Sequence, residues 1–428
     1  MADRFMQKLI FLYVIACCIG PAVLSVNAGF MHVSIGRMLQ PIMFVMCLYK
    51  IMSHPKAYCL QMPLKPNTYS VCFFILWLLY ALLSCLWTLD RYSWLRGYYF
   101  LFGGVVVILA FSLYLDSVKS IKHLLAVLMW MIFAHTLIGY YEMLSGNYFF
   151  LSDLSRLGVY QAYKIPVSSM NNVNDYAMLI MIGIYSTLAV HMTSKKRIMK
   201  AVSMIFMIMM FIMCVLTRSR GILFGLILSM VIGSLLYRQL RRKLLSLAIL
   251  GLMFFIIALI MLSSLREYVT GFCTEVFTFN VKENSSDFVR LNLILNGLLF
   301  LMKNLLMGTG LGGIEYYMQN YAVLDTLGIM NMHNWWFEIL VASGIFIFCG
   351  YCFFYVRLLN HMWRCSKHSN ERDVSNLGMV MVGFLTAFPI ASISSSSIMG
   401  ADIIWTYFAI IIAFEGIATK YGGMSDTT

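Results

Sequence analysis

The sequence predicts an all-α polytopic membrane protein with about 12 transmembrane helices. Hydrophobic residues make up 61% of the 428-residue chain and charged residues only 11%, whereas a soluble domain carries roughly a quarter charged residues. Apolar runs recur along the whole chain, each about 20 residues long, which is enough to cross a hydrocarbon core of about 30 Å. We expect helices because the backbone groups of a segment in lipid must be satisfied within that segment.

The distribution of basic residues supports this number of spans. We expect spans at about 8–27, 33–52, 69–88, 96–115, 122–143, 173–193, 201–216, 221–237, 244–264, 335–356, 375–395 and 400–419. The basic connections that follow even-numbered spans are 54–67, 116–123, 195–200, 238–243 and 357–373. With both termini in the cytoplasm, all of these connections face the cytoplasm, as the positive-inside rule requires. No small-residue cleavage site follows the first apolar run, so we expect it to be retained as a span.

Charge and cysteine content exclude some functions. The formal net charge is +13, but the basic residues form short clusters between apolar runs, which does not favour nucleic-acid binding. The eleven cysteines are scattered, mostly within apolar runs, and their spacing does not match that of metal ligands. We expect them to be buried packing residues. The sequence predicts neither a metal site nor a cofactor.

Two long loops are predicted outside the cell in this single membrane domain of residues 1–428. They are 144–172 and 265–334, the second of which lies between spans 9 and 10. Long loops in compact proteins are usually functional. Within the second loop, residues 287–308 are predicted to form an amphipathic helix that lies on the membrane or across a cavity. The glycines of 308–313 end this helix, and a nucleotide site there is not favoured because no strand precedes them and no Lys-Ser/Thr follows.

Two arginines occupy the short connection TRSRG between spans 7 and 8. Arg218 and Arg220 lie at the outer membrane boundary in this prediction, where a charge is costly unless it is compensated. They either reach lipid phosphates or a carboxylate, or they bind an anionic ligand, since guanidinium matches phosphate oxygens in a bidentate manner.

Other basic residues of the outer loops are candidates for the same ligand. Arg290 follows Asp287 at the start of the amphipathic segment, and a local salt bridge between them is the alternative. Arg156 and Lys164 lie in the other outer loop, where a solvated surface is the alternative. Both loops are predicted to face the same side of the membrane.

A histidine and an asparagine precede span 10 in the stretch NMHNWWFEILVASG (331–344). His333 is either an interfacial residue beside the aromatic belt of Trp335 and Trp336 or a group that moves a proton. Asn334 is a candidate for substrate binding. At the start of span 6, Asn174 or Asp175 is expected to cap the helix, and a hydrogen bond from Asn174 to sugar hydroxyls is the alternative.

The order of these features resembles that of the O-antigen ligase and polymerase superfamily of bacterial envelope glycosyltransferases. The resemblance spans most of the chain: twelve spans, a long outer loop before the last three, a short basic turn between spans 7 and 8, and a histidine motif at the end of the loop. The ligases are known for a histidine followed by ten residues and a glycine, and His333 to Gly344 fits that spacing.

Two further motifs support the resemblance, one of them imperfectly. The ligases carry an arginine followed by three residues and a leucine. Arg218 is followed by three residues and Ile222, a near match, and Arg220 does not fit. The segment N-x-N-D-Y-A (172–177) and the segment 290–313 look like those of superfamily members that build surface polysaccharide, such as O-antigen, capsule or lipopolysaccharide chains.

The resemblance implies a donor glycan carried on undecaprenyl diphosphate at the outer face of the inner membrane. Its reducing-end sugar would be transferred to an acceptor hydroxyl. Arg218, Arg220 and Arg290 are then candidates to stabilise the departing diphosphate. His333 is the candidate general base, or a donor that orients the diphosphate.

The same resemblance leaves reserve candidates and suggests a mechanism. The carboxylates of Asp287 and Glu315 are reserve candidates for the base, and Glu338 lies too far into span 10. Because no Asp-x-Asp cluster lies on the outer face, we expect metal-independent transfer with inversion by a single displacement.

The acceptor distinguishes two activities. A polymerase uses another lipid-linked repeat unit and a ligase uses the lipid A core. The imperfect arginine motif and N-x-N-D-Y-A favour the polymerase, which the family pairs with a flippase and a chain-length regulator. A flippase or secondary transporter is the alternative of a different class. Such proteins place ionisable groups near mid-membrane, and Arg37 is the clear example in this sequence.

Overall fold

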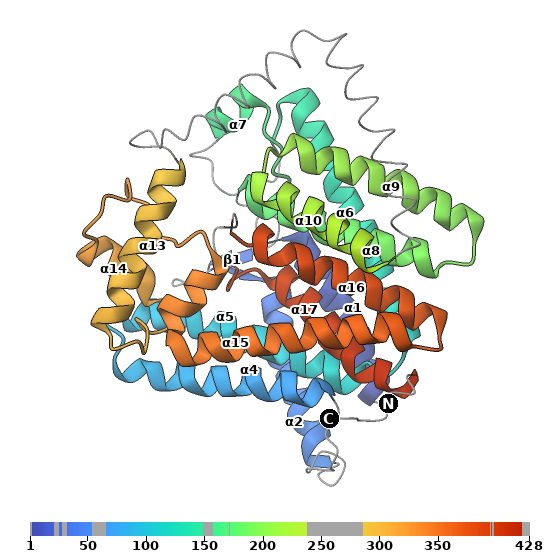
Figure 1. Ribbon diagram of the computed structural model, residues 1–428, viewed down its shortest axis with the longest axis horizontal. Coiled ribbons are helices and arrows are strands. Elements are labelled where there is room, and N and C mark those ends of the chain that lie inside the picture. The colour runs from blue at the N-terminus through green and yellow to red at the C-terminus, as the bar shows by residue number, and fades with distance from the viewer. Residues whose placement is uncertain are drawn as a thin grey trace.

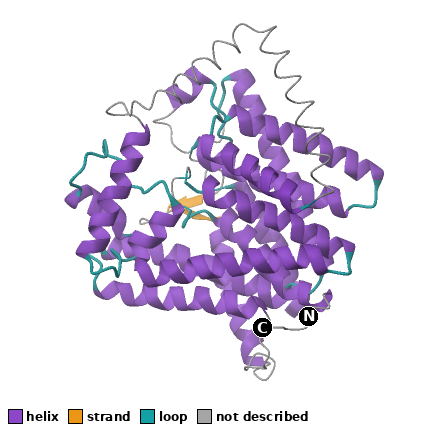
Figure 2. Ribbon diagram, in the orientation of Figure 1, coloured by secondary structure: helices purple, strands orange, loops and turns teal. Residues whose placement is uncertain are grey.

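A computed structural model describes residues 2–20, 25–27, 32–53, 66–148, 157–170, 172–237, 286–393, 395 and 398–421. These residues form a bundle of long helices that run roughly alongside one another, with shorter helices at one end (Figures 1 and 2). The described residues outside helices are mostly short connections, and a small pair of strands lies at the same end as the short helices (Figure 2). The predicted all-α polytopic class is confirmed.

The long helices of the bundle are α1 (Ala2–Ile19), α2 (Ile35–Ser53), α4 (Pro66–Leu83), α5 (Arg91–Tyr114), α6 (Val118–Ser145), α8 (Val173–Thr193), α9 (Arg197–Leu216), α10 (Arg220–Leu236), α15 (Trp335–His368), α16 (Arg372–Ala391) and α17 (Asp402–Ala418). The remaining elements are α7 (Leu157–Tyr163), α13 (Ser286–Lys303), α14 (Gly313–Tyr321), the 3-10 turns η1 (Ser84–Leu86) and η3 (Thr419–Tyr421), and the antiparallel strands β1 (Ser25–Asn27) and β2 (His32–Ser34).

Nine of the described helices are long and apolar enough to cross a membrane, and α10 is a shorter apolar helix. The predicted span at 244–264 and the basic connection at 238–243 lie outside the described residues, so the predicted total of about 12 spans stays a prediction. Most observed helices match the predicted spans within a few residues. At the N-terminus, α1 begins and ends earlier than predicted: it covers Ala2–Ile19, whereas the predicted span is 8–27.

The core lies around α17 and α8. Every residue of α17 from Ile403 to Ala418 is buried, and α17 packs against α5, α4, α1 and α15. Around this core, α9 exposes large apolar side chains such as Ile205, Ile208 and Ile212. Helices α10 and α16 approach each other backbone to backbone, since a Cβ on Gly225 would lie only 2.6 Å from the carbonyl oxygen of Ala387.

Helix α15 is broken at Gly344, which has φ 78° and ψ 175°. The Trp335 Nε1 donates to the Tyr351 hydroxyl at 2.8 Å, although the two residues are 16 positions apart. In a straight helix they would be about 24 Å apart along the axis at 1.5 Å per residue. The part before the break, the short arm (335–343), therefore folds back beside the part after it, the long arm (345–368).

This break changes the prediction for span 10. We expected one continuous span over 335–356, with His333 at its mouth. The long arm alone is about 36 Å long at 1.5 Å per residue, which is sufficient to cross the membrane. His333 instead precedes the short arm, whose first residue, Trp335, reaches back to Tyr351 of the long arm.

We call the end of the bundle that carries Asn174, Ser219, His333 and Ser392 the His333 end. Helices α8, α10 and α17 begin there, and α9 and α16 end there. In Figure 1 this end lies to the left, where α4 and α15 extend farther than α16 and α17, and where α13 and α14 cross the end of the bundle.

Candidate functional site

The arginine turn (217–220) joins α9 to α10 at the His333 end. Arg218 has φ 56°, a left-handed conformation that is uncommon for a residue other than glycine. The Thr217 hydroxyl donates to the Cys214 carbonyl oxygen at 2.6 Å and accepts from the Ser219 backbone N–H at 3.4 Å. Thr217 and Ser219 are buried, whereas the side chains of Arg218 and Arg220 are exposed. The neutral residues of the turn are thus buried and hydrogen-bonded, while both arginine side chains are exposed.

The start of α8 holds this turn. The Ser219 hydroxyl donates to the Asn174 side-chain oxygen at 2.9 Å. Capping of α8 is done by Asn172, whose side-chain oxygen accepts from the backbone N–H groups of Asn174 and Asp175. The expectation that Asn174 or Asp175 caps this helix is therefore wrong. Their side chains are directed to other elements because Asn172 already satisfies the free N–H groups of the first turn.

Asp175 connects α8 to the loop after α16. Its carboxylate accepts from the Ser395 hydroxyl at 2.6 Å and from the Asn172 side-chain amide at 2.6 Å. Ser395 is buried. Sequence reasoning had treated Asp175 only as a possible cap and had not considered Ser395. The serine run ISSSS (393–397) beside an outer helix end was the available signal for this contact.

The segment at His333 is fixed by the end of α16. The Trp335 backbone N–H donates to the Ser392 carbonyl oxygen at 3.2 Å, and the Trp336 Nε1 contacts the Pro389 carbonyl oxygen and the Ser392 hydroxyl, each at 3.2 Å. Asn334 is buried and caps the short arm, accepting from the Trp336 and Phe337 backbone N–H groups. His333 itself has φ 48° and a half-buried side chain.

A chain of contacts brings the arginine turn and the His333 segment to the same place. Gly225, about 7.5 Å along α10 from Arg220 at 1.5 Å per residue, lies against α16, where its Cβ would be 3.3 Å from the Ala391 backbone nitrogen. The next residue, Ser392, accepts the hydrogen bond from Trp335. The two motifs are over 100 positions apart in sequence, and both lie near the end of α16.

The turn after α13 forms hydrogen bonds with the backbone on both sides of the break in α15. The Ile345 N–H donates to the Leu306 carbonyl oxygen at 3.0 Å, and the Thr309 N–H donates to the Val341 carbonyl oxygen at 2.8 Å. Gly308 lies so close that a Cβ there would be 2.6 Å from the Gly344 nitrogen. The glycine eleven positions after His333 thus makes room for backbone that passes between the two arms.

The glycine-rich segment 308–313 packs against protein. A Cβ on Gly312 would lie 2.2 Å from the Ser93 carbonyl oxygen, and one on Gly310 would lie 2.9 Å from the Thr88 Cβ. This segment therefore links α13 and α14 to the start of α5. Helix α13 ends at Lys303, five positions before the glycines that we expected to end it.

Arg290 and His333 each lie next to a residue of the same apolar cluster. Its neighbour Val289 belongs, with Met332 and Val341, to one cluster of buried residues formed by α13, α14 and the short arm. Met332 directly precedes His333. The side chain of Arg290 is half-buried, at the start of the same helix.

The other predicted site residues are less closely connected. Lys164 is exposed and follows α7, and Arg156 lies outside the described residues. Glu315 forms an ion pair with Arg96 of α5 at 2.5 Å, so this reserve base is already engaged. The side chain of Asp287 lies outside the described part, and Glu338 belongs to the short arm.

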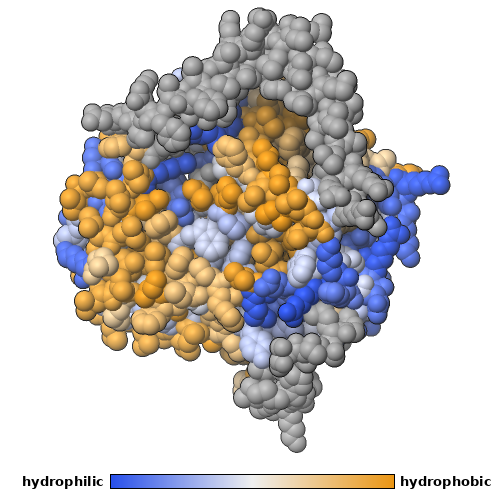
Figure 3. Space-filling view, viewed as in Figure 1, coloured by the Kyte–Doolittle hydropathy of each residue, from blue (hydrophilic) through white to orange (hydrophobic). Residues whose placement is uncertain are grey.

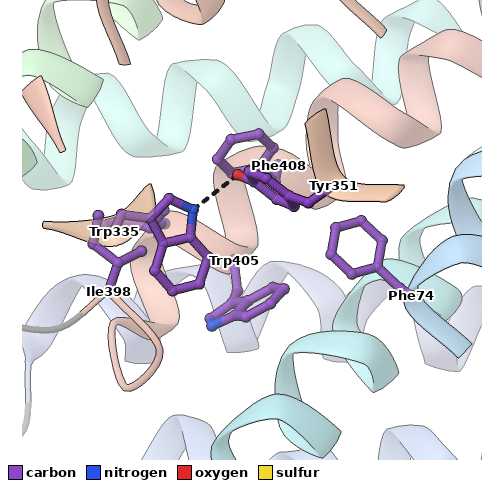
Figure 4. A pocket seen from close by; sticks show the side chains of 7 residues that line it. Phe74, Trp335, Tyr351, Ile398, Trp405 and Phe408 are labelled. Atoms are coloured by element: carbon purple, nitrogen blue, oxygen red, sulfur yellow. Dashed lines mark hydrogen bonds between the residues drawn. The ribbon is translucent and has the colours of Figure 1, made fainter. Parts of the chain in front are cut away.

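An apolar pocket lies beside the short arm. Figure 4 shows it between Trp335, Tyr351 and Phe74, with Trp405, Phe408 and Ile398 completing the walls. These residues come from α15, α4, α17 and the loop before α17. Its lining is aromatic and aliphatic, so it suits an apolar group and not a phosphate or a sugar hydroxyl. No group of three or more His, Cys, Asp or Glu residues in the described part of the chain is arranged to hold a metal ion.

Two comparisons with known proteins bear on this arrangement. The O-antigen ligase family model matches residues 205–352. The teichuronic acid biosynthesis protein TuaE of Bacillus subtilis (strain 168) is 24% identical over 350 residues, which cover 81% of this chain and 72% of that protein. The resemblance to the O-antigen ligase and polymerase superfamily is confirmed.

The O-antigen ligase match covers only part of the site. It includes the arginine turn, Arg290, His333 and Gly344. Asn174, Asp175 and Ser395 lie outside it. Asn174 contacts the matched region through Ser219, and Asp175 bonds to Ser395 of the loop after α16, which is also outside the match. The site is thus completed by α8 and by the last connection of the bundle.

The sequence predicted one clear ionisable group within the membrane, Arg37, and the structure shows a different arrangement. Arg37 lies in the first turn of α2, where it pairs with Asp402 at 3.1 Å and donates to the Gly400 carbonyl oxygen at 2.7 Å. Sequence reasoning missed Glu415, which is fully buried and pairs with Arg357 at 2.7 Å. Asp402 and Glu415 lie near opposite ends of α17, whereas Arg357 lies at the middle of the long arm of α15.

Proposed function

We propose that this protein polymerises a surface polysaccharide. It would transfer a glycan from undecaprenyl diphosphate to the acceptor sugar of another lipid-linked repeat unit. The observation that carries the proposal is that the arginine turn and the His333 segment lie near the same end of α16, which contacts Gly225 of α10 and Trp335. The O-antigen ligase match and the similarity to a protein of teichuronic acid biosynthesis support the general class of reaction.

The chemistry needs a base and a means of stabilising negative charge. The acceptor hydroxyl oxygen attacks the anomeric carbon, and the bond from that carbon to the diphosphate oxygen breaks with inversion. The acceptor proton passes to His333 as general base. The diphosphate leaves with the bonding electrons, and fixed guanidinium groups of Arg218, Arg220 and Arg290 stabilise the added charge because they are positioned before the reaction.

The neighbouring polar residues would orient the substrates. We propose that Arg218, Lys164 and Arg156 bind the anionic part of the donor, and that Asn174 and Asn334 shape the site. Asn334 acts at least as a helix cap, since its side-chain oxygen accepts two backbone N–H groups. No metal ion is invoked in this mechanism, because the arginines supply the positive charge.

Ligation to a lipid A core is the second candidate, and the spacing from His333 to Gly344 favours it because the ligases carry that motif. The structure gives the spacing a physical role in either activity. Gly344 permits the fold-back of the short arm, whatever acceptor is used. The imperfect arginine motif and N-x-N-D-Y-A favour the polymerase.

We also propose a location and partners. The protein would lie in the inner membrane with both termini in the cytoplasm and the His333 end outside, because the basic connections that the structure describes, between α5 and α6, α8 and α9, and α15 and α16, lie at the other end. A flippase would supply the donor and a chain-length regulator would act with the polymerase. A cysteine in place of exposed Lys164 should react with a membrane-impermeant thiol reagent in intact cells, and protection there would contradict this orientation.

The test is the length of the surface polysaccharide, read as a ladder on a gel, in a strain that lacks this gene. Complementation with the wild-type gene should restore the ladder. Complementation with His333→Ala should leave a single repeat unit on its lipid anchor if the protein is a polymerase. Full-length chains that remain on the undecaprenyl carrier would indicate a ligase, and a normal ladder with His333→Ala would remove His333 from the mechanism.

A further inference from the structure

Helix α13 has two apolar faces. One face packs against α14 and the short arm through Val289, Leu293 and Phe300. The opposite face exposes Leu291, Leu295, Leu299 and Met302, which are 50%, 40%, 49% and 67% exposed. A helix at a water boundary normally carries polar residues on its exposed face, and one that is apolar all round lies in an apolar environment.

The apolar surface continues beyond the helix. We call Leu291, Leu295, Leu299 and Met302 of α13, with Leu305 in the turn after it, the leucine stripe; Leu305 is 83% exposed. No charged residue belongs to the stripe. Exposed leucines of α4 and of η1 are found towards the same end of the bundle, namely Leu79, Leu82 and Leu83 of α4 and Leu86 of η1. Figure 3 shows a broad apolar surface over the left of the molecule, where Figure 1 places α13, α14, α4 and the start of the long arm.

We propose that the leucine stripe lies in the lipid of the leaflet at the His333 end. Helices α4 and α15 are candidate membrane spans by length and composition, so we expect the exposed apolar surface of α4 and the long arm to face lipid, and the stripe continues that surface across the end of the bundle. An exposed apolar patch of this kind marks contact with a membrane or another protein. Continuity with the lipid-facing spans identifies the acyl chains of the leaflet as the occupant.

The position of α13 also suggests how the donor of the proposed reaction reaches the site. Only this step of the inference rests on the proposed function. Arg290 directly precedes Leu291, the first residue of the stripe, so its guanidinium would lie at the depth of the lipid headgroups. A lipid-linked diphosphate would then reach Arg290 by lateral movement within the leaflet. Long basic side chains at the edge of an apolar face commonly extend to the headgroup level.

Photo-crosslinking tests which molecule covers the stripe. p-Benzoylphenylalanine would replace Leu295 or Leu299 in the full chain, reconstituted in vesicles of phosphatidylethanolamine and phosphatidylglycerol. The control position is Asn320, an exposed polar residue at the end of α14. After irradiation, mass spectrometry should show adducts of lipid mass at positions 295 and 299, with a clearly lower yield at 320.

Two results would overturn the proposal. Crosslinked dimers at positions 295 and 299 would show that a second copy covers the stripe. The absence of adducts above the control yield would show that water surrounds it. Neither result depends on glycan transfer, so either can occur with the proposed function intact. Conversely, loss of the function in a polysaccharide assay leaves the lipid adducts as expected.

Discussion

Two arginine sites of this protein differ in what surrounds them. Arg357 is partly buried among α15, α17 and α4, where it pairs with the fully buried Glu415 at 2.7 Å and donates to the Ser70 hydroxyl at 2.5 Å. Arg220 is exposed at the start of α10, next to Ser219, which is held by the neutral Asn174. The first arginine is part of the packing between helices. The second has an exposed side chain, on a turn whose buried Ser219 bonds to the start of α8.

The comparison separates stability from function. Removing one partner of a buried ion pair leaves the other charge uncompensated, and that is costly. Removing an exposed arginine leaves no such charge in the core. We therefore expect changes at Arg357 to act on folding and changes at Arg220 to act on transfer. The predictions below test the physical basis of this separation, from the largest expected effect to the smallest.

Arg357→Ala should lower the free energy of unfolding by about 3–5 kcal/mol, because Glu415 would remain buried without its cation. The matched control is the double variant Arg357→Met with Glu415→Leu, which removes both charges and should stay within about 1–2 kcal/mol of the wild type. Thermal unfolding in detergent measures both. If the single and double variants lost the same free energy of unfolding, the loss would come from the missing attraction of the ion pair and not from the uncompensated charge of Glu415.

Gly344→Ala should destabilise the His333 end. Its φ of 78° and ψ of 175° belong to a region that is occupied almost only by glycine, and another residue there costs about 1–3 kcal/mol. A Cβ would also lie 2.5 Å from the Leu306 carbonyl oxygen. Gly146→Ala is the control, since Gly146 has φ 71° but no atom within 4 Å of its Cβ.

The difference in stability between these two glycine variants measures how much the close contact between the turn after α13 and the break contributes. Thermal unfolding should show a clearly larger loss for Gly344→Ala. If Gly146→Ala were as destabilising, backbone conformation alone would explain both, and the packing of backbone between the two arms would contribute nothing.

The smallest effects concern the two asparagine caps. Asn172→Ala and Asn334→Ala should each lower stability by about 1 kcal/mol, the usual effect of losing an N-cap. Serine at either position also caps a helix, so Asn334→Ser should restore stability. If Asn334 only caps, Asn334→Ser also retains transfer. Loss of transfer with stability retained would show that the amide contacts substrate.

The sequence predicted the elements better than the path of the chain between them. Apolar runs and basic connections located α2, α8 and α16 within a few residues, because the membrane imposes length and charge rules that a single sequence reveals. They did not reveal the fold-back at Gly344. The run from Trp335 onward is mostly apolar, and only contacts with Leu306 and Thr309 show why a glycine interrupts it.

The candidate site was predicted in part for a similar reason. Arginine and histidine stand out in an apolar sequence, so Arg218, Arg220 and His333 were recognised as candidates. Asp175 and Ser395 were not, because a serine run and an aspartate near a helix start are common, and their 2.6 Å hydrogen bond joins residues 220 positions apart. Glu415 was missed inside a predicted span, where its pairing with Arg357 depends on a helix far away in sequence.

The central claim is that the His333 end carries out transfer while the Arg357–Glu415 pair supports the fold. The most direct test measures glycan transfer and thermal unfolding in the same preparations of Arg220→Ala and Arg357→Ala. Arg220→Ala should lose about 100- to 1000-fold in transfer rate, the usual effect of removing one group that stabilises developing charge, and its melting temperature should fall less than that of Arg357→Ala because its side chain is exposed. Arg357→Ala should melt at a lower temperature and keep its transfer rate per folded molecule. The reverse pattern, with transfer intact in Arg220→Ala and lost in folded Arg357→Ala, would contradict the account.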